Sequence, residues 1–462
     1  MTFTQHAPRT TPMSKHYLII GNGAAGVSAA EVIRQRDAAA RITILTEEPY
    51  PMYSRPGIAY VLNGQVPAEQ IIARRPSFYT EHRFDLRVGR AISLDTARQQ
   101  VTLNGGSVLG YDVVLVATGA AATAAPFPNN DLAGIVTFDK MDDVRHILDL
   151  TRKAKRAVIV GGGITAMELA EGIAHQGVKT HFLQRGDRLW PRLLNQSESD
   201  IIEHQIKHEG ILLHYKEEIA EAIGKKGQLV GVKLKSGQQL ACDILGVAIG
   251  VKPNLDLIKG TPIEIKHGIL VNQHLQSNIS TVFAAGDTAQ VYDRWTKSHQ
   301  LDILWPSAIQ EGRAAGTNMV DVAHGRPPGH TYQKGSPFNA AMLFGIHMTA
   351  MGQISDHRDS DALQEAAHLS RGSSFVWTTP FAATVHSAWD RQGPHSIRLA
   401  MDRGRVIGAL ILGYQELADP LRTLIEHSVD VSAYQDDILN SGHNLPHIIA
   451  RIWRDVAPKS LA

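Results

Sequence analysis

The segment GNGAAG has a residue spacing that indicates a specific chemistry, with Gly21, Gly23 and Gly26 around Ala24 and Ala25. In this Gly-x-Gly-x-x-Gly pattern, the first glycine permits a tight turn and the second lets a pyrophosphate approach the backbone. The third lets a helix pack closely on a strand. The segment follows an apolar stretch and opens a helix, whose N-terminal N–H groups favour negative charge. We therefore expect these five residues to bind the pyrophosphate of a dinucleotide.

Glu47 stands at the end of the next expected strand, about 20 residues beyond the glycines. A carboxylate at this point can accept hydrogen bonds from a ribose diol. A glycine-rich turn followed by a solvated glutamate would give the same letters, so that alternative stays open at this point.

A second segment of the same design is RAVIVGGGITAMELA, which contains Gly161, Gly163 and Ile164, with Ala166 at the third glycine position. Alanine is a permitted variant there. Two strand–turn–helix–strand units predict an α/β protein with two Rossmann-like dinucleotide-binding domains and parallel sheets.

The rest of the chain supplies elements that would complete these domains. The letters NGG at 104–106 predict a hairpin, and YDVVLVATG reads as a buried parallel strand. Pro306 is expected at the first position of a helix. After the RPPG turn, residues 331–462 alternate short strands with turns and end in helical segments, which predicts a C-terminal α+β domain.

Composition narrows the classes of function. The 462 residues carry a net charge of +1, which gives no electrostatic case for a nucleic-acid partner. The single cysteine, Cys242, cannot form an internal disulfide or a cysteine metal site, so a reducing cytoplasm is the default expectation and the thiol is expected to be buried. The 22 histidines are scattered without HExxH, which favours surface histidines and no metal. Residues 1–14 are expected to be a flexible tail, and no apolar run is long enough to span a membrane.

Four motifs in order, GNGAAG, VLVATG, GGGITAMELA and TVFAAGD, resemble those of the FAD-dependent pyridine nucleotide-disulfide oxidoreductases. The resemblance extends over residues 15–455. It implies that the first unit binds FAD, that the second binds NADH or NADPH, and that the NAD(P) domain is inserted into the FAD domain. The domains implied are FAD-binding 15–124, NAD(P)-binding 125–250, FAD-binding 251–330 and C-terminal interface 331–462.

The resemblance also implies roles for particular residues. Asp287 would bond the ribityl chain of FAD, Glu168 would lie near the nicotinamide and the flavin, and Trp305 would line the flavin site unless it is an ordinary buried residue at a helix start. The remaining cofactor-binding residues expected are Ala91, Thr118, Gly119, Gly250 and Gly286.

The choice between NADH and NADPH depends on the end of the strand after the second glycine turn. The residues there are Gln184 and Arg185. A neutral glutamine does not repel a 2′-phosphate, and an arginine could pair with one. Equally, Gln184 could bond the ribose diol while the arginine stays solvated, so both nucleotides remain candidates.

The segment YSRPGIA separates the branches of the family. Aligned on GIA, Pro56 occupies the place where thiol-dependent members carry their redox cysteine. The chain therefore resembles the branch without that thiol, which includes ferredoxin and rubredoxin reductases and the FAD/NAD portion of nitrite reductases. In that branch Arg55 would contact the adenosine–pyrophosphate half of FAD. Tyr60 stands where ferredoxin reductases carry a lysine, so Glu168 loses its usual cationic partner.

The resemblance implies that NAD(P)H passes a hydride to FAD, which passes electrons to a carrier protein such as a ferredoxin or rubredoxin. Two alternatives are an oxidase or quinone reductase that uses a small acceptor, and a non-enzymatic flavoprotein whose redox state controls partner binding. The C-terminal domain resembles the family's interface domain, which makes a homodimer an expectation.

Overall fold

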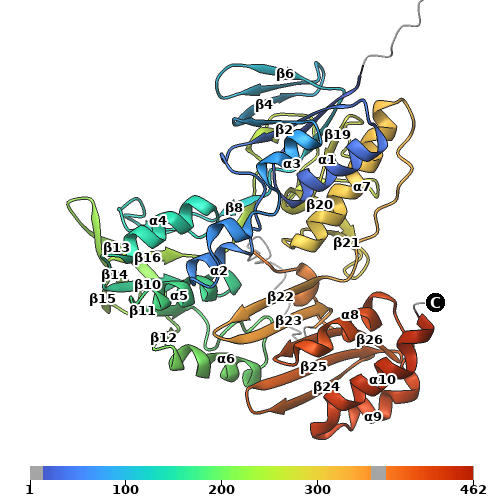
Figure 1. Ribbon diagram of the computed structural model, residues 1–462. Coiled ribbons are helices and arrows are strands. Elements are labelled where there is room, and N and C mark those ends of the chain that lie inside the picture. The colour runs from blue at the N-terminus through green and yellow to red at the C-terminus, as the bar shows by residue number, and fades with distance from the viewer. Residues whose placement is uncertain (1–13, 355–370, 461–462) are drawn as a thin grey trace, which may run out of the picture.

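The computed structural model describes residues 14–354 and 371–460. Figure 1 shows two α/β units and a C-terminal sheet covered by helices, with the C-terminal unit lying against both of the others. Most of the predicted tail, residues 1–13, lies outside the described residues.

The first parallel sheet has the strand order β19–β7–β1–β2–β3. Its strands are β1 (His16–Ile20), β2 (Arg41–Thr46), β3 (Phe84–Val88), β7 (Val113–Val116) and β19 (Val282–Ala284). The central strands are buried on both faces, as their continuous apolar runs require. Because β19 pairs with β7, residues near 283 complete a sheet that the first 116 residues begin.

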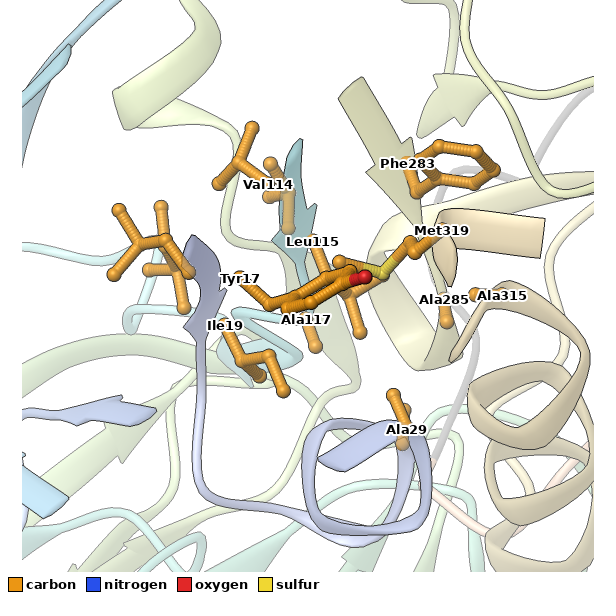
Figure 2. Packing of buried hydrophobic residues seen from close by; sticks show 14 of the residues in the cluster. Tyr17, Ile19, Ala29, Val114, Leu115, Ala117, Phe283, Ala285, Ala315 and Met319 are labelled. Atoms are coloured by element: carbon orange, nitrogen blue, oxygen red, sulfur yellow. The ribbon is translucent and has the colours of Figure 1, made fainter. Parts of the chain in front are cut away.

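Helices α1 (Ala24–Arg36) and α7 (Trp305–Ala323) pack together against this sheet. Their backbones approach so closely that a Cβ on Gly312 would lie 2.1 Å from the Ala25 carbonyl oxygen. Figure 2 shows Ala29 of α1 and Met319 of α7 on the same side of the strands, next to Tyr17. Helix α7 begins at Trp305 with Pro306 in its first turn, which confirms the helix predicted there.

The second parallel sheet has the order β12–β11–β10–β16–β9. Its strands are β9 (Ile135–Val136), β10 (Arg156–Val160), β11 (Lys179–Gln184), β12 (Leu212–Tyr215) and β16 (Ile244–Val247). Helices α4 (Met141–Thr151), α5 (Ile164–His175) and α6 (Gln196–His208) belong to this unit. Cys242 is fully buried in its core, as expected.

Smaller elements connect and extend these sheets. The NGG letters do form a hairpin, between two strands of an antiparallel sheet. Two short strands pair where the chain leaves the first unit and where it returns, β8 (Ala120–Ala122) and β17 (Val251–Pro253). The other short elements are α2 (Ile58–Leu62), α3 (Pro76–Glu81), β4 (Ala91–Asp95), β5 (Gln100–Leu103), β6 (Val108–Gly110), β13 (Ile219–Lys225), β14 (Gln228–Leu234), β15 (Gln239–Ala241), β18 (Ile269–Leu270), β20 (Ala289–Asp293) and β21 (Ser298–Gln300).

The C-terminal part is an antiparallel sheet of order β22–β23–β26–β25–β24, with helices against it, which confirms the α+β prediction. The strands are β22 (Phe338–Leu343), β23 (Ile346–Gly352), β24 (Val385–Gln392), β25 (His395–Asp402) and β26 (Arg405–Leu412). The helices are α8 (Ala418–Glu426), α9 (Gln435–Leu439) and α10 (Leu445–Ser460). A buried ion pair between Arg398 and Glu198 of α6 joins this sheet to the second unit, with Nε 2.9 Å from Oε1. The domain boundaries at 124, 250 and 330 stay predictions.

No helix in the described part of the chain combines the length and the apolar character needed to cross a membrane.

Candidate active site

A cavity of about 540 Å³ runs along the carboxyl end of the first sheet. It is lined by both nucleotide-binding units and also by residues of β22 and of the segment that begins at Arg371. Most residues predicted from the sequence line it: Gly21, Gly23, Ala24, Ala25, Glu47, Arg55, Tyr60, Ala91, Thr118, Gly119, Ile164, Glu168, Gly286, Asp287 and Trp305. The tertiary structure therefore brings residues from well-separated stretches of sequence, between Gly21 and Trp305, to one site.

The first glycine turn has a backbone geometry that requires glycine at two positions. Gly21 adopts φ +125°, and a Cβ there would lie 2.0 Å from the carbonyl oxygen of Ala117. Gly26 does not line the cavity, but a Cβ on it would lie 2.0 Å from the Gly21 carbonyl oxygen. Both glycines are therefore needed for α1 to start at the cavity wall, where its free N–H groups can bind an anion.

Glu47 and Arg90 lie at the part of the cavity where the family resemblance would put the adenosine half of FAD. The Arg90 Nε lies 3.5 Å from the Glu47 Oε1, and both side chains are largely exposed. Glu47 follows the last strand residue of β2, which leaves its carboxylate at the mouth of the cavity. Arg90 was not predicted, although its position beside Ala91 was the available signal.

Arg55 lies deeper in the cavity wall. Its Nη2 donates to Oε1 of Glu48 at 2.5 Å, and its Nη1 donates to the Asp139 carbonyl oxygen at 2.9 Å. Its guanidinium carbon also lies 5.7 Å from the centre of the Tyr53 ring. These contacts hold Arg55 in place beside the region where the pyrophosphate is expected.

Tyr60 of α2 and Glu168 of α5 line the opposite end of the cavity. Burial, with a further contribution from Glu171, raises the pKa of the Glu168 carboxyl to about 8, and the Arg371 cation opposes that rise. Burial also raises the pKa of the Tyr60 phenol, and the neighbouring Glu168 adds to the effect. The resemblance implies a lysine paired with this glutamate. Here Tyr60 stands in place of the lysine, and both Tyr60 and Glu168 favour their protonated forms.

The N-terminus of α7 closes the same end. Trp305 is the first residue of the helix and lines the cavity. Glu311 lies further along the same helix, and its carboxylate accepts a hydrogen bond at 2.7 Å from the backbone N–H of Gly286. Burial raises the pKa of Glu311 to about 8. This bond ties α7 to the loop that carries Asp287.

Some residues in or directly behind the cavity wall gave no signal in the sequence. Asp139 precedes α4, is buried, and interacts with both Arg55 and Arg371. Arg371 and Asn339 come from the C-terminal part of the chain. Their types are common and their neighbours form no motif, so only the tertiary structure identifies them.

The second glycine turn lies beside the cavity rather than in its wall. Gly161 adopts φ +151°, with its Cβ position 2.1 Å from the Ala248 carbonyl oxygen, and Gly163 is the N-cap of α5. Gln184 is buried and its Nε2 donates to the Gly161 carbonyl oxygen at 2.8 Å. Gly161, Gly163, Gln184, Arg185 and Gly250 do not line the cavity, whereas Ile164 and Glu168 of the following helix do.

A redox thiol is absent from this cavity in the described residues. Pro56 lines it at the position expected for a cysteine in thiol-dependent relatives. Burial raises the pKa of the Cys242 thiol to about 12, and Cys242 lies in the core of the second unit.

The order of the two glycine turns and the shared cavity agree with a comparison against known families. Residues 15–308 match the family model described as pyridine nucleotide-disulphide oxidoreductase. The chain belongs to this family. Membership implies FAD and a pyridine nucleotide as cofactors, and the first turn adjoins the cavity while the second does not line it.

Two curated relatives show the range of the resemblance. The chain is 29% identical over 341 residues to the NADH-dependent phenylglyoxylate dehydrogenase subunit epsilon of Aromatoleum evansii, covering 73% of this chain and 79% of that one. It is 25% identical over 374 residues to the assimilatory nitrate reductase electron transfer subunit of Bacillus subtilis (strain 168). That match covers 79% of this chain but 46% of the relative, less than two thirds of its length.

Among solved structures, the fold is similar to a ferredoxin reductase for the CYP199A2 system from Rhodopseudomonas palustris. The TM-score is 0.78 at 19% identity, over 91% of this chain and 97% of the other. This similarity confirms the predicted fold class of two Rossmann-like units and a C-terminal sheet domain.

Proposed function

We propose that the protein is an FAD-dependent NAD(P)H oxidoreductase that passes electrons to a carrier protein such as a ferredoxin or rubredoxin. The observation that carries the proposal is the shared cavity. The first glycine turn lines one part of it, and Ile164 and Glu168, from the helix that follows the second turn, line another. Two dinucleotides bound at the two turns would therefore bring their redox rings together near Glu168.

We further propose a place in the cavity for each part of FAD. Gly21, Gly23 and the N-terminus of α1 would hold the pyrophosphate, and Glu47 would accept hydrogen bonds from the ribose. Asp287 would bond the ribityl chain, and Trp305 and Tyr60 would lie at the flavin end. Bound FAD supplies the capacity to accept a hydride and to release electrons singly or in pairs.

The chain's own residues contribute position and charge. The partial positive charge at the start of α7 would favour negative charge at that end of the cavity. Glu168, with its raised pKa, would be largely protonated at neutral pH and would not repel an approaching nucleotide. The cavity extends over both units, so two rings bound in it would be partly shielded from water.

A carrier protein is the proposed electron acceptor because relatives of this chain are named for electron transfer. Cys242 is buried elsewhere, and among the described residues no cluster of His, Cys, Asp or Glu could hold a metal. The names of the relatives support this choice, since one is an electron transfer subunit and one structure is a ferredoxin reductase. The second candidate function is an oxidase that passes electrons to oxygen or a quinone. It would use the same cavity and would need no partner protein.

The test begins with anaerobic titration of the FAD-loaded protein with NADH and with NADPH, following the flavin absorbance. Bleaching by either nucleotide is expected, and the ratio of the two rates decides the cofactor preference. Steady-state oxidation is then measured with ferredoxin, with rubredoxin, and with oxygen alone. Fast turnover with oxygen alone would support the oxidase, whereas a flavin that neither nucleotide bleaches would contradict both enzymatic functions and leave the redox-switched binding protein.

The proposal of a homodimer through the C-terminal sheet has a separate test. Light scattering coupled to size exclusion should give twice the chain mass of 50.4 kDa. A monomeric mass at micromolar concentration would contradict it.

A further inference from the structure

Arg371 reaches the cavity from the C-terminal part of the chain, far in sequence from both glycine turns. Its segment is fixed by backbone hydrogen bonds to the residue pair before α7. The Gly372 N–H donates to the Ile303 carbonyl oxygen at 2.9 Å, and the Ile303 N–H donates to that of Ser373 at 3.2 Å. Ile303, Arg371 and Gly372 all line the cavity. The position of Arg371 is therefore set by the same backbone that leads into Trp305.

The guanidinium of Arg371 contacts all the parts of the chain that meet at the cavity. It forms an ion pair with Asp139, donates to the Ala120 carbonyl oxygen at 3.2 Å, and lies 3.6 Å from Asp287. Its side chain is 15% exposed. Asp139 also pairs with Arg55, at 3.8 Å. The two arginines therefore share one buried carboxylate, and Arg371 also forms an ion pair with Asp287.

One donor of this arginine is unsatisfied. The Nε of Arg371 is buried and has no hydrogen-bond partner among the described residues. Buried polar groups are nearly always paired, and a buried charged donor without a partner costs free energy. At the wall of a cavity, a small rotation of the guanidinium would give this donor a partner if a ligand oxygen stood there. A ligand oxygen in the cavity could thus satisfy a donor that the described residues leave without a partner.

We propose that Arg371 is an FAD-binding residue, which donates hydrogen bonds to oxygens at the flavin end of the cofactor and places a positive charge beside the ring. The proposal rests on the proposed function, because it assigns FAD to this cavity. The flavin end is chosen because Arg371 faces Asp287 and the cation acts on Glu168, both on that side of the cavity. It makes the C-terminal part a component of the cofactor site as well as an interface.

A cation beside the ring has a second consequence. Reduction adds negative charge to the flavin, and a nearby positive charge stabilises that charge more strongly in a partly buried site than in water. Removing the cation should therefore weaken FAD binding and also make the midpoint potential of the bound flavin more negative. A residue with a structural role alone would not shift the potential in this direction.

The test compares Arg371→Gln and Arg371→Lys with wild type, using Arg454→Gln on the exposed face of α10 as the control. FAD is titrated into each apoprotein, and Kd is measured from the quenching of flavin fluorescence. The midpoint potential is measured on samples saturated with FAD. We expect Kd to rise about 10- to 100-fold in Arg371→Gln, as for a lost hydrogen bond from a charged group, with a more negative potential. Arg371→Lys should bind FAD with intermediate affinity and restore most of the potential.

The results separate this inference from the proposed function. Wild-type affinity and potential in Arg371→Gln would overturn the inference and leave the function intact. A wild-type protein that binds no FAD would overturn both. If thermal unfolding shows that Arg371→Gln does not fold, Arg371→Lys decides, since it keeps the charge but loses the fork of donors. An unchanged Kd in that variant would overturn the inference.

Discussion

The two glycine turns begin alike and end differently. In both, the first glycine has a positive φ and fits against the carbonyl oxygen at the end of the neighbouring strand, Ala117 for Gly21 and Ala248 for Gly161. At the third position, a Cβ on Gly26 would meet the Gly21 carbonyl oxygen, whereas Ala166 occupies the corresponding place in the second turn with its side chain fully buried. The first helix therefore lies closer to its turn than the second.

The residues at the ends of the following strands differ as well. Glu47 is largely exposed at the mouth of the cavity, whereas Gln184 is buried and bonded to Gly161. The first turn is enclosed by later parts of the chain, including α7 and the segment at Arg371. The second turn is braced by its own unit. The first site thus depends on distant residues and the second on local ones, and five substitutions test this difference.

Removing Lys334 should have the largest effect, because its ion pairs fix the segment that leads into α7, and α7 encloses the first site. Its side chain is buried and pairs with Asp293 and, at 3.1 Å, with Asp302, which precedes α7. Lys334→Met would leave two buried carboxylates without a cation, which costs about 3–5 kcal/mol of unfolding free energy. Urea unfolding of the apoprotein measures the loss, with exposed Lys266→Met as the control.

The same variant should lose FAD while keeping the second site. Pyridine nucleotide binding, measured by calorimetry at a temperature where the variant is folded, should change less than threefold. A drop in both affinities by the same factor would show that the two sites are not independent.

Gly26→Ala tests the closer approach of the first helix directly. The new Cβ would lie 2.0 Å from the Gly21 carbonyl oxygen, so the helix and the turn must move apart. We expect a loss of roughly 3 kcal/mol in stability and little FAD retained on purification. The reciprocal change, Ala166→Gly, should cost about 1 kcal/mol, since it removes only helix propensity and a buried methyl group. Equal costs would contradict the asymmetry between the turns.

Gln184→Ala tests the local brace of the second site. The change removes the hydrogen bond to the Gly161 carbonyl oxygen and should cost about 1–2 kcal/mol of pyridine nucleotide binding, or roughly tenfold in KM. FAD content should be unchanged, because Gln184 does not line the cavity. Gln176→Ala is the matched control, since it removes another glutamine bond to a backbone carbonyl, that of Leu62. A KM for NADH and NADPH equal to wild type would show that the brace is not needed.

Local patterns were enough to predict one class of feature in this molecule. The glycine turns, the hairpin at 104–106 and the start of α7 follow from short-range geometry, so the sequence predicts them. The residues that enclose the first site were not predictable in this way. Asp139, Lys334 and Arg371 lie in ordinary loops, and their roles depend on partners up to 251 residues away in sequence. Tyr60 was singled out only because it departs from the family pattern.

Glu168 should also change the pH dependence of stability. Its pKa in the folded apoprotein is raised to about 8, while the unfolded value is the ordinary 4.5. The folded state therefore binds more protons than the unfolded state between these values, and stability must fall as pH rises from about 4.5 to 8. Glu311 has the same direction of shift and contributes the same sign.

Glu168→Gln should therefore make the unfolding free energy fall less steeply as pH rises. Some decrease should remain, because Glu311 is still present. Unfolding free energies of the apoprotein from pH 5 to 8.5 give the slope, with exposed Glu264→Gln as the control. Bound FAD should alter the contribution of Glu168 to the pH dependence of stability, because Glu168 lines the cavity. The corresponding residue of the second site, Gln184, carries no charge and contributes no such dependence. A wild-type slope in Glu168→Gln would mean that this carboxyl is ionised throughout, and the flavin end would then carry a permanent negative charge opposite Arg371.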